Sequence, residues 1–405
     1  MNSQNNSCSK FAKIYTMLIV LYPIISMYWS GISSLSVADF LLILSIIKCL
    51  VDIIGKGWIK ITKTWGFLGA FTALHFFVTC CFFDETTDEF FTFLRFFAYV
   101  FSIAIMIPNY FNRDLGLVYL RVSGVLVALF CLIQAGGIYV LGIYIKGYIP
   151  FLPIMREDLA RYGQSYTSGV LRVRGVFAEP AFLATYFALV LTVTLFTKTR
   201  KKYLWAVLET IAMIFSVSTT AYAMLLLIWG IYFVLFLRQT DQHTKNNLIL
   251  MALVFLGAIV VISFVLRSEL FVLFKYRFQT ESFSGRMNSY AIFEDDSISG
   301  IGRIIGNGYA DYKYYLPSIP FIYWRYGNLG LIIIAALYLW NFIVNKGVVN
   351  KLILLVFAIL CIGTQAFVSY TVLFYMAFVG EYELLTFEQG ALKEIDERRN
   401  QKCYS

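Results

Sequence analysis

The amino-acid sequence predicts an all-α, polytopic integral membrane protein with about twelve transmembrane helices and two large outer loops. Apolar residues make up 60% of the 405 residues and charged residues only 14%, whereas an ordinary globular domain has roughly 25% charged residues. The apolar runs are continuous for about twenty residues, the length that a helix needs to cross the hydrocarbon. Strands of a membrane barrel would instead alternate apolar and polar residues over about ten positions. We therefore expect helices, whose backbone groups find all their partners internally in lipid.

Ten apolar runs follow one another and are expected to form a single membrane domain over residues 1–405. Eight of them fit one span each: 14–30, 37–54, 65–83, 90–107, 116–145 (one long or broken helix), 181–197, 247–266 and 321–344. No small-residue cleavage site follows the first run, so we expect a retained span and not a signal peptide. The runs 203–237 and 351–383 are too long for one crossing, and each contains a polar patch, Ser216–Thr220 and Gly363–Gln365. Each of these two runs is predicted to be a helical hairpin.

The charges of the short loops predict the orientation, because cytoplasmic loops carry an excess of Lys and Arg. Basic segments alternate with segments that lack cations. The basic segments are 55–64, 198–202 and the tail 384–405, and the segments without cations are 31–36 and 84–89. This alternation predicts that both termini are cytoplasmic. It also predicts that the two long loops, 146–180 and 267–320, lie on the outer side. If 203–237 were a single helix, the second long loop would be cytoplasmic instead.

The two long loops are the expected place of function, because long loops without regular structure are usually functional. They contain no cysteine and hence no disulfide framework. They carry eleven cations: Lys146, Arg156, Arg161, Arg172, Arg174, Arg267, Lys275, Arg277, Arg286, Arg303 and Lys313. Lipid headgroups account for some of them, but arginine also binds phosphate oxygens through two planar contacts. We expect an anionic ligand here. Nucleic acid is excluded, because the net charge of +9 is not gathered on one face.

The segment Arg172–Pro180 has the clearest local pattern for chemistry. Pro180 is suited to the first turn of a helix, where its missing N–H costs nothing. Glu179 is then placed at the helix start beside Arg172 and Arg174, where the helix dipole and the arginines keep a carboxylate ionised. It can act as a base, or it can cap the helix and pair with Arg174. Both readings remain open from the residues alone.

The second long loop combines glycine turns, tyrosines and acidic residues. Gly306 and Gly308 permit a tight turn but lack the context of a phosphate-binding loop. Aromatic rings suit sugar faces and also suit the interfacial belt of a membrane protein. The expected substrate-binding residues of the two loops and the following span are Arg156, Arg161, Arg277, Arg303, Tyr309, Tyr314, Tyr315 and Arg325. Glu294, Asp295 and Asp296 are read as a solvated acidic turn in preference to a metal site.

The order of these features over residues 120–345 resembles the bacterial O-antigen polymerase (Wzy-type) and ligase superfamily. The matching features are Arg172-Val-Arg174-Gly leading to Glu179-Pro180, Gly285-Arg286 in the second loop, the Gly306-Asn-Gly308 turn, and Tyr326-Gly-Asn-Leu-Gly330 at the next helix. The paired Arg-x10-Gly pattern of some polymerases is absent. The resemblance implies a glycosyltransferase of the bacterial inner membrane that acts at the periplasmic face without a cofactor or metal. Its catalytic residues would map onto Arg172, Arg174 and Arg286, with Glu179 as the best candidate base.

The resemblance also implies the partners. They are undecaprenyl-diphosphate-linked oligosaccharides as donor and acceptor, membrane lipid, and a chain-length regulator protein. The ligases have a functional histidine in the large periplasmic loop, whereas this chain has only His75, in a span, and His243, in a cytoplasmic loop. This difference favours a polymerase. A flippase for lipid-linked oligosaccharides remains the alternative from another class, and a glycosyltransferase using lipid-phosphate sugars is a third option, given the acidic segment 84–89.

Overall fold

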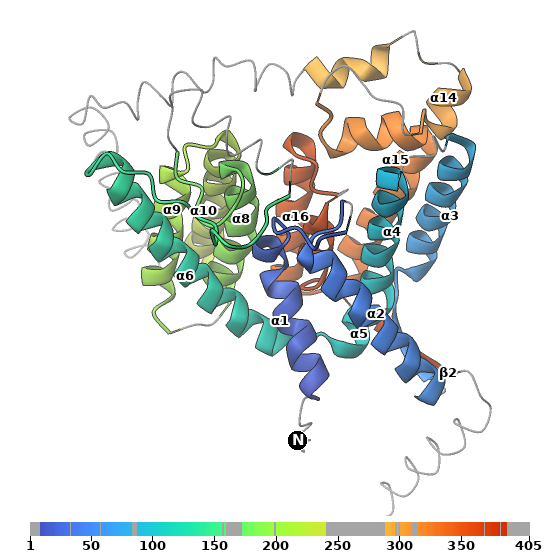
Figure 1. Ribbon diagram of the computed structural model, residues 1–405, viewed down its shortest axis with the longest axis horizontal. Coiled ribbons are helices and arrows are strands. Elements are labelled where there is room, and N and C mark those ends of the chain that lie inside the picture. The colour runs from blue at the N-terminus through green and yellow to red at the C-terminus, as the bar shows by residue number, and fades with distance from the viewer. Residues whose placement is uncertain are drawn as a thin grey trace, which may run out of the picture.

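The structure, a computed structural model, is a bundle of helices with a two-stranded sheet at one end (Figure 1). It describes residues 9–32, 34–56, 58–82, 87–155, 158, 172–197, 200–239, 288–295, 298, 300–308, 315–367, 369–380 and 382–386. The predicted span 247–266 lies outside the described residues. So do large parts of both long loops.

Within residues 9–139, the described part of the chain forms six α-helices and one strand. Their bounds are α1 (Lys10–Ile25), α2 (Val37–Lys56), β1 (Trp58–Thr62), α3 (Trp65–Phe82), α4 (Thr87–Phe101), α5 (Ile107–Tyr110) and α6 (Arg113–Tyr139). A π-helical turn, η1 (Ser102–Met106), joins α4 to α5. Side chains cap several of these helices: Ser9 Oγ accepts from Ala12 N in α1, and Asn112 Oδ1 accepts from Leu115 N in α6. Such caps satisfy the unpaired amides of the first turn and fix where each helix begins.

The second half adds α8 (Pro180–Phe196), α9 (Lys202–Phe215), α10 (Thr219–Gln239), the short helices η2 (Ser289–Glu294) and α14 (Gly300–Ile305), α15 (Ser318–Val344), α16 (Val348–Gly363), α17 (Tyr370–Met376) and β2 (Tyr382–Thr386). Helix α8 is apolar on all sides and almost entirely buried, as expected of a helix at the centre of a bundle. It packs against α6, α9, α10 and α16. Gly124 allows α6 to approach it closely, since a Cβ there would lie 2.5 Å from Val190 Cγ1.

Among the described residues, four helices are long and apolar enough to cross a membrane: Phe90–Tyr110, Arg113–Tyr139, Thr219–Leu237 and Ser318–Val344. Three shorter apolar helices accompany them: Trp65–Cys81, Pro180–Phe196 and Val348–Gly363. Only 22% of the most apolar window of Ser318–Val344 is buried inside the protein. Exposed apolar surface of this kind marks a contact with lipid or with another protein. The fold is therefore mostly helical and compatible with a membrane protein, as predicted, while the number of about twelve spans stays a prediction.

The predicted hairpin at 203–237 is confirmed as two antiparallel helices. The chain reverses at Ser216–Ser218, where Val217 has a φ of 47°. Trp229 Nε1 in α10 donates to Thr210 Oγ1 in α9 at 2.9 Å. The chain also reverses after α16, at the predicted Gly363–Gln365 patch, but the second arm is shorter than predicted. Helix α17 has only 7 residues, and the chain then turns into β2.

The sheet marks one end of the bundle, which we call the sheet end. Strand β1 pairs antiparallel with β2, with Trp58 opposite Thr386. Asn109 Nδ2 donates to the Lys60 carbonyl at 2.7 Å and so fastens α5 to β1. Arg113 Nη2 donates to Asn350 Oδ1, which brings the starts of α6 and α16 to the same end.

The opposite end, which we call the loop end, gathers the segments between the other helix termini. Trp29 N donates to Pro153 O at 2.8 Å, and Ser318 N donates to Thr364 O at 2.9 Å. These bonds bring together the 26–36 turn with the first long loop, and the second long loop with the α16–α17 turn. Figure 1 shows the sheet end at the bottom and α14 at the top. Because α6 and α8 both run between these ends, the start of α8 lies at the loop end.

Further details differ from the prediction. Strand β1 lies in the segment 55–64, which was expected to be a loop. Strand β2 begins at the end of the run 351–383, which was expected to be helical, and continues into the expected cytoplasmic tail 384–405. Helix α6 ends at Tyr139 and not near 145, because Gly142 has a φ of 65° and the chain then becomes irregular. The predicted span 90–107 contains the π-helical turn η1, which nothing in its apolar run indicated.

Candidate functional site

The segment Arg172–Glu179 is held against the end of α6 by the side chain of Gln134. Gln134 Oε1 accepts from Arg174 N and from Gly175 N, both at 2.9 Å. Gln134 Nε2 donates to the Ile145 carbonyl at 2.7 Å. Gln134 is fully buried, so three backbone groups that would otherwise lack a partner are satisfied by one amide. This side chain therefore fixes the path of the segment that leads into α8.

Gly175 makes the turn of this segment possible. Its φ is 60°, in the left-handed region that favours glycine. A Cβ at Gly175 would lie 2.9 Å from Cys131 Sγ, and a Cβ at Gly147 would lie 1.8 Å from the Gly175 carbonyl oxygen. The turn is thus pressed between α6 and the first part of the long loop. In the sequence, this glycine is marked only as part of the Arg172-Val-Arg174-Gly motif of the resemblance.

Arg174 has a buried side chain, only 1% exposed. Its Nη1 donates to the Ala178 carbonyl at 3.0 Å, and its guanidinium lies over the Tyr144 ring at 5.4 Å from the centroid. A buried guanidinium needs such partners, because removing the charge from water is costly. Arg174 thereby ties the turn to the residue just before Glu179. In this conformation its contacts suit a positioning role.

Glu179 is the N-cap residue of α8, and Pro180 occupies the first turn, as predicted. Glu179 has extended backbone angles, with φ −134° and ψ 151°, and its side chain makes no capping hydrogen bond to the helix. Its carbonyl accepts from Phe182 N at 3.1 Å, which starts the helix. Glu179 and Arg172 are both half-buried. The carboxylate therefore lies at the positive end of the α8 dipole without being used as a cap.

The glycine turn of the second loop docks into a break in α15. Gly327 interrupts the helix with φ 63° and ψ −162°. Asn307 N donates to Trp324 O at 2.7 Å, and Gly308 N donates to Arg325 O at 3.3 Å. A Cβ on Gly306 would lie 2.2 Å from the Arg325 carbonyl oxygen, and one on Gly327 would lie 2.3 Å from the Ile304 carbonyl oxygen. The two glycine motifs, at Gly306–Gly308 and at Gly327, thus interlock, and we call them together the glycine unit.

Three of the predicted binding residues surround this unit. Arg325 Nε donates to Gly308 O at 3.4 Å, and its guanidinium lies over the Phe321 ring at 4.7 Å. Arg303 Nη2 donates to Asp295 O at 3.3 Å. Tyr315 is 50% exposed, and its hydroxyl accepts from Gln365 N at 3.3 Å. Arg325 therefore supports the turn through the Gly308 carbonyl, and Arg303 ties α14 to the end of η2, while both arginines remain half-buried.

The described site residues fall into two groups. Arg172, Arg174 and Glu179 lie at the start of α8, which packs against α6, whereas Arg303 and Arg325 lie where α14 meets α15, which packs against α3. Figure 1 shows α14 and α3 on the right and α6 on the left. The remaining predicted residues lie outside the described residues: Arg156, Arg161, Arg277, Arg286, Tyr309 and Tyr314. The role of Arg172 and Arg286 as a clamp, in which arginines of both long loops hold one anionic ligand, therefore stays a prediction.

His75, the histidine of the described residues, is enclosed between helices. It is 2% exposed, and its Nδ1 lies 2.7 Å from the hydroxyl of Tyr326. The rings of Phe96 and Tyr326 lie 4.8 Å and 5.6 Å from the imidazole. Since Tyr326 belongs to the break in α15, this pair links α3 to the glycine unit. His243 lies outside the described residues.

Two buried carboxylates were missed by the sequence analysis. Asp39 accepts from Tyr22 Oη at 2.5 Å and from Tyr99 Oη at 2.9 Å, and its Oδ2 lies 3.5 Å from Arg95 Nε. Glu209, fully buried in α9, accepts from Thr194 Oγ1 at 3.0 Å. Ionisable residues within apolar helices are functional candidates by default. A single acidic residue in the apolar run 203–237 was the signal that could have found Glu209.

In the described part of the chain, no three His, Cys, Asp or Glu side chains lie close enough together to hold a metal ion. Comparison with known proteins adds no assignment: no family model matches the chain, and no curated protein matches it.

Proposed function

We propose that the protein is an inner-membrane glycosyltransferase that polymerises undecaprenyl-diphosphate-linked oligosaccharide repeat units into O-antigen or a related surface polysaccharide. The observation that carries this proposal is the Arg172–Pro180 segment. It presents a carboxylate that does not cap its helix, in the same short segment as Arg172 and Arg174, at the start of an almost fully buried apolar helix. A base next to a phosphate-binding group is what transfer from a lipid diphosphate requires.

The proposed reaction moves the growing chain onto one new repeat unit. Glu179 accepts the proton of an acceptor sugar hydroxyl, and the hydroxyl oxygen bonds to the anomeric carbon of the donor. The bond between that carbon and the diphosphate oxygen breaks, and undecaprenyl diphosphate leaves. Arg172 and Arg286 stabilise the charge that develops on the leaving diphosphate. No cofactor enters the step.

The contacts of Arg174 and Gln134 support a positioning role in this reaction. Gln134 holds the backbone at Arg174 and Gly175, and Arg174 holds the carbonyl of Ala178, which precedes Glu179. A base must stay within hydrogen-bond reach of its proton. We assign the substrate-binding role to Arg156, Arg161, Arg277, Arg303, Tyr309, Tyr314, Tyr315 and Arg325.

The proposal includes the topology. About twelve spans, with both termini cytoplasmic, place the loops 146–180 and 267–320 in the periplasm. The loop end then faces the periplasm, and the sheet end faces the cytoplasm. The observed hairpin α9–α10 supports this assignment, because a single helix there would reverse the side of the second loop.

A flippase for lipid-linked oligosaccharides is the second candidate. The observation that favours it is the ion pair of buried Asp39 with half-buried Arg95, together with buried Glu209, since transporters use ionisable residues inside the bundle. A ligase is less well supported, because His75 belongs to the apolar helix α3 and is packed against Tyr326 of α15.

The test of the proposed base is Glu179→Gln. Glutamine keeps an acceptor oxygen but cannot take up a proton, so the rate should fall by roughly 10²–10⁴. Cells should express the variant at a normal level but leave the substrate as single repeat units, seen as loss of the chain-length ladder on a gel. Asp114→Asn is the matched control, because Asp114 is an exposed carboxylate in the first turn of α6 at the sheet end. A normal ladder from Glu179→Gln would contradict the role of Glu179 as base.

A further inference from the structure

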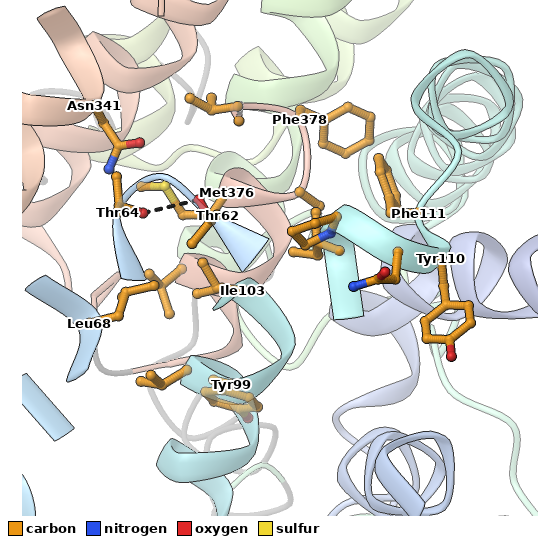
Figure 2. Close-up of a pocket in the computed structure, with 18 of the residues that line it drawn as sticks. Thr62, Thr64, Leu68, Tyr99, Ile103, Tyr110, Phe111, Asn341, Met376 and Phe378 are labelled. Atoms are coloured by element: carbon orange, nitrogen blue, oxygen red, sulfur yellow. Dashed lines mark hydrogen bonds between the residues drawn. The ribbon is translucent and has the colours of Figure 1, made fainter. Parts of the chain in front are cut away.

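A cavity of about 490 Å³ lies inside the bundle at the sheet end (Figure 2). This volume falls within the range of roughly 300–1,000 Å³ typical of small-molecule sites. Residues of α1, α3, α4, η1, α5, β1, the start of α6, α15 and α17 line it. None of the residues assigned to the glycosyltransferase reaction is among them, so the cavity is a separate site at the opposite end of the helices.

The inner wall of the cavity is mostly apolar, with the buried polar side chains of Thr62, Thr64 and Asn341 among its lining. Phe71 and Tyr99 are 1% and 3% exposed, and Phe378 is fully buried. Figure 2 shows Leu68, Ile103 and Met376 gathered around the hydroxyls of Thr62 and Thr64, which share a hydrogen bond of 3.1 Å. Such a wall suits a hydrocarbon chain, whose burial is favourable in proportion to its apolar area.

The mouth of the cavity is polar and positively charged. Ser9, Arg113 and Gly380 are the exposed lining residues, and all lie at the sheet end. Lys60 and Arg113 contribute two cations to the lining, and no Asp or Glu of the described residues lines it. Asn350 Oδ1 takes a hydrogen bond from Arg113 Nη2. A guanidinium has five N–H donors, which leaves several for an anion.

The π-helical turn η1 contributes Ile103 to this wall. Turns of this kind inside α-helices occur frequently at functional sites. The helix continues through the turn, and Tyr99, Ile103 and Ile107 all line the cavity. The π-helical turn, which the sequence did not indicate, therefore lies at the cavity wall.

We propose that the cavity binds an anionic phospholipid, with one acyl chain inside the bundle and the phosphate at Lys60 and Arg113. The ligand chemistry follows from an apolar interior, a cationic mouth and a lining without carboxylates. Arginine binds phosphate through two parallel hydrogen bonds. Basic pockets between helices on the cytoplasmic side of a membrane bind anionic lipid headgroups. The bound lipid then comes from the membrane leaflet at the sheet end.

The test is lipid binding to the purified full chain, followed by native mass spectrometry. The protein is titrated with phosphatidylglycerol and, separately, with phosphatidylcholine of the same acyl chains. We expect one phosphatidylglycerol to bind at least tenfold more tightly than phosphatidylcholine. Arg113→Gln should abolish this preference by removing the phosphate contact, and Leu68→Trp should weaken binding at least tenfold by filling the interior. Inorganic phosphate should not displace the lipid, because it lacks the chain.

Lys13→Gln is the matched control, because Lys13 is an exposed cation of α1 near the same end that does not line the cavity. It should bind phosphatidylglycerol like the unmodified protein. If Leu68→Trp fails to fold, Arg113→Gln and Lys60→Gln decide the outcome alone. Equal binding of both lipids, or an unchanged preference in Arg113→Gln, would overturn the proposal. The readout is independent of polymer formation, so this result leaves the proposed reaction unaffected.

Discussion

Gln134→Leu is expected to release the segment that carries Glu179 without unfolding the bundle. Leucine has a similar volume but neither donates nor accepts. The substitution removes the two bonds from Arg174 N and Gly175 N and the bond to the Ile145 carbonyl. Each buried hydrogen bond contributes about 1 kcal/mol net. The closed form of the segment should therefore lose about 3 kcal/mol relative to an open form, since three such bonds disappear.

A thiol directly beneath the segment reports this opening. Cys131 is fully buried, and a Cβ on Gly175 would touch its sulfur at 2.9 Å. A loss of about 3 kcal/mol corresponds to about a hundredfold larger open population. In Gln134→Leu, a small maleimide should therefore label Cys131 about a hundredfold faster. Mass spectrometry of the peptide that contains Cys131 measures the rate separately from that of the exposed Cys80 and Cys81.

The control for this experiment is Ser123→Ala. Ser123 is also a buried polar residue of α6, and its hydroxyl lies 2.8 Å from that of Tyr186. Losing this bond should lower stability slightly but leave Cys131 protected, because Ser123 does not hold the segment. If Gln134→Leu folded normally and labelled at the unmodified rate, Gln134 would not be what fixes the segment.

Three further predictions concern the second loop, the arginines and the topology. Gly306→Ala should destabilise the protein by about 2–4 kcal/mol, because a left-handed non-glycine residue costs about 1–2 kcal/mol and the new Cβ would lie 2.2 Å from a carbonyl oxygen. The control is Gly300→Ala, since Gly300 has open space around it; this variant should have the same melting temperature as the unmodified protein. Arg172→Lys and Arg286→Lys should each shorten the polymer at normal protein levels, since lysine cannot bind a diphosphate at two points; full-length polymer from both would place the clamp elsewhere. Alkaline-phosphatase fusions after residues 165 and 290 should be active and one after 200 inactive, whereas activity at 165 without activity at 290 would contradict the twelve-span topology.

Local features of the fold were predictable from the sequence because their signals are local. Continuous apolar runs marked the positions of the helices, and Ser216–Thr220 marked a reversal inside one run. Pro180 marked the start of α8, since proline is tolerated in the first turn of a helix. Helix ends were less accurate, as at Tyr139, where the apolar run continues but the helix stops.

The features that were missed depend on contacts between distant parts of the chain. Strands β1 and β2 pair residues more than 300 positions apart, so neither segment alone indicates a sheet. In the sequence, Gly306 and Gly327 belong to two separate glycine motifs, and neither motif indicates that the two glycines dock against each other. Gln134 gave no signal either, because a glutamine within an apolar run reveals its role only when its three backbone partners are known.

The most direct test of the proposed polymerase activity is the identity of the lipid-linked sugars that accumulate when the gene is deleted. The proposal predicts single repeat units on undecaprenyl diphosphate in the outer leaflet of the inner membrane, because the units would be delivered but not joined. Restoring the unmodified gene should restore the ladder of chain lengths. Single units confined to the inner leaflet would contradict a polymerase and indicate a flippase. Accumulated long chains still linked to the lipid would also contradict it and indicate a ligase.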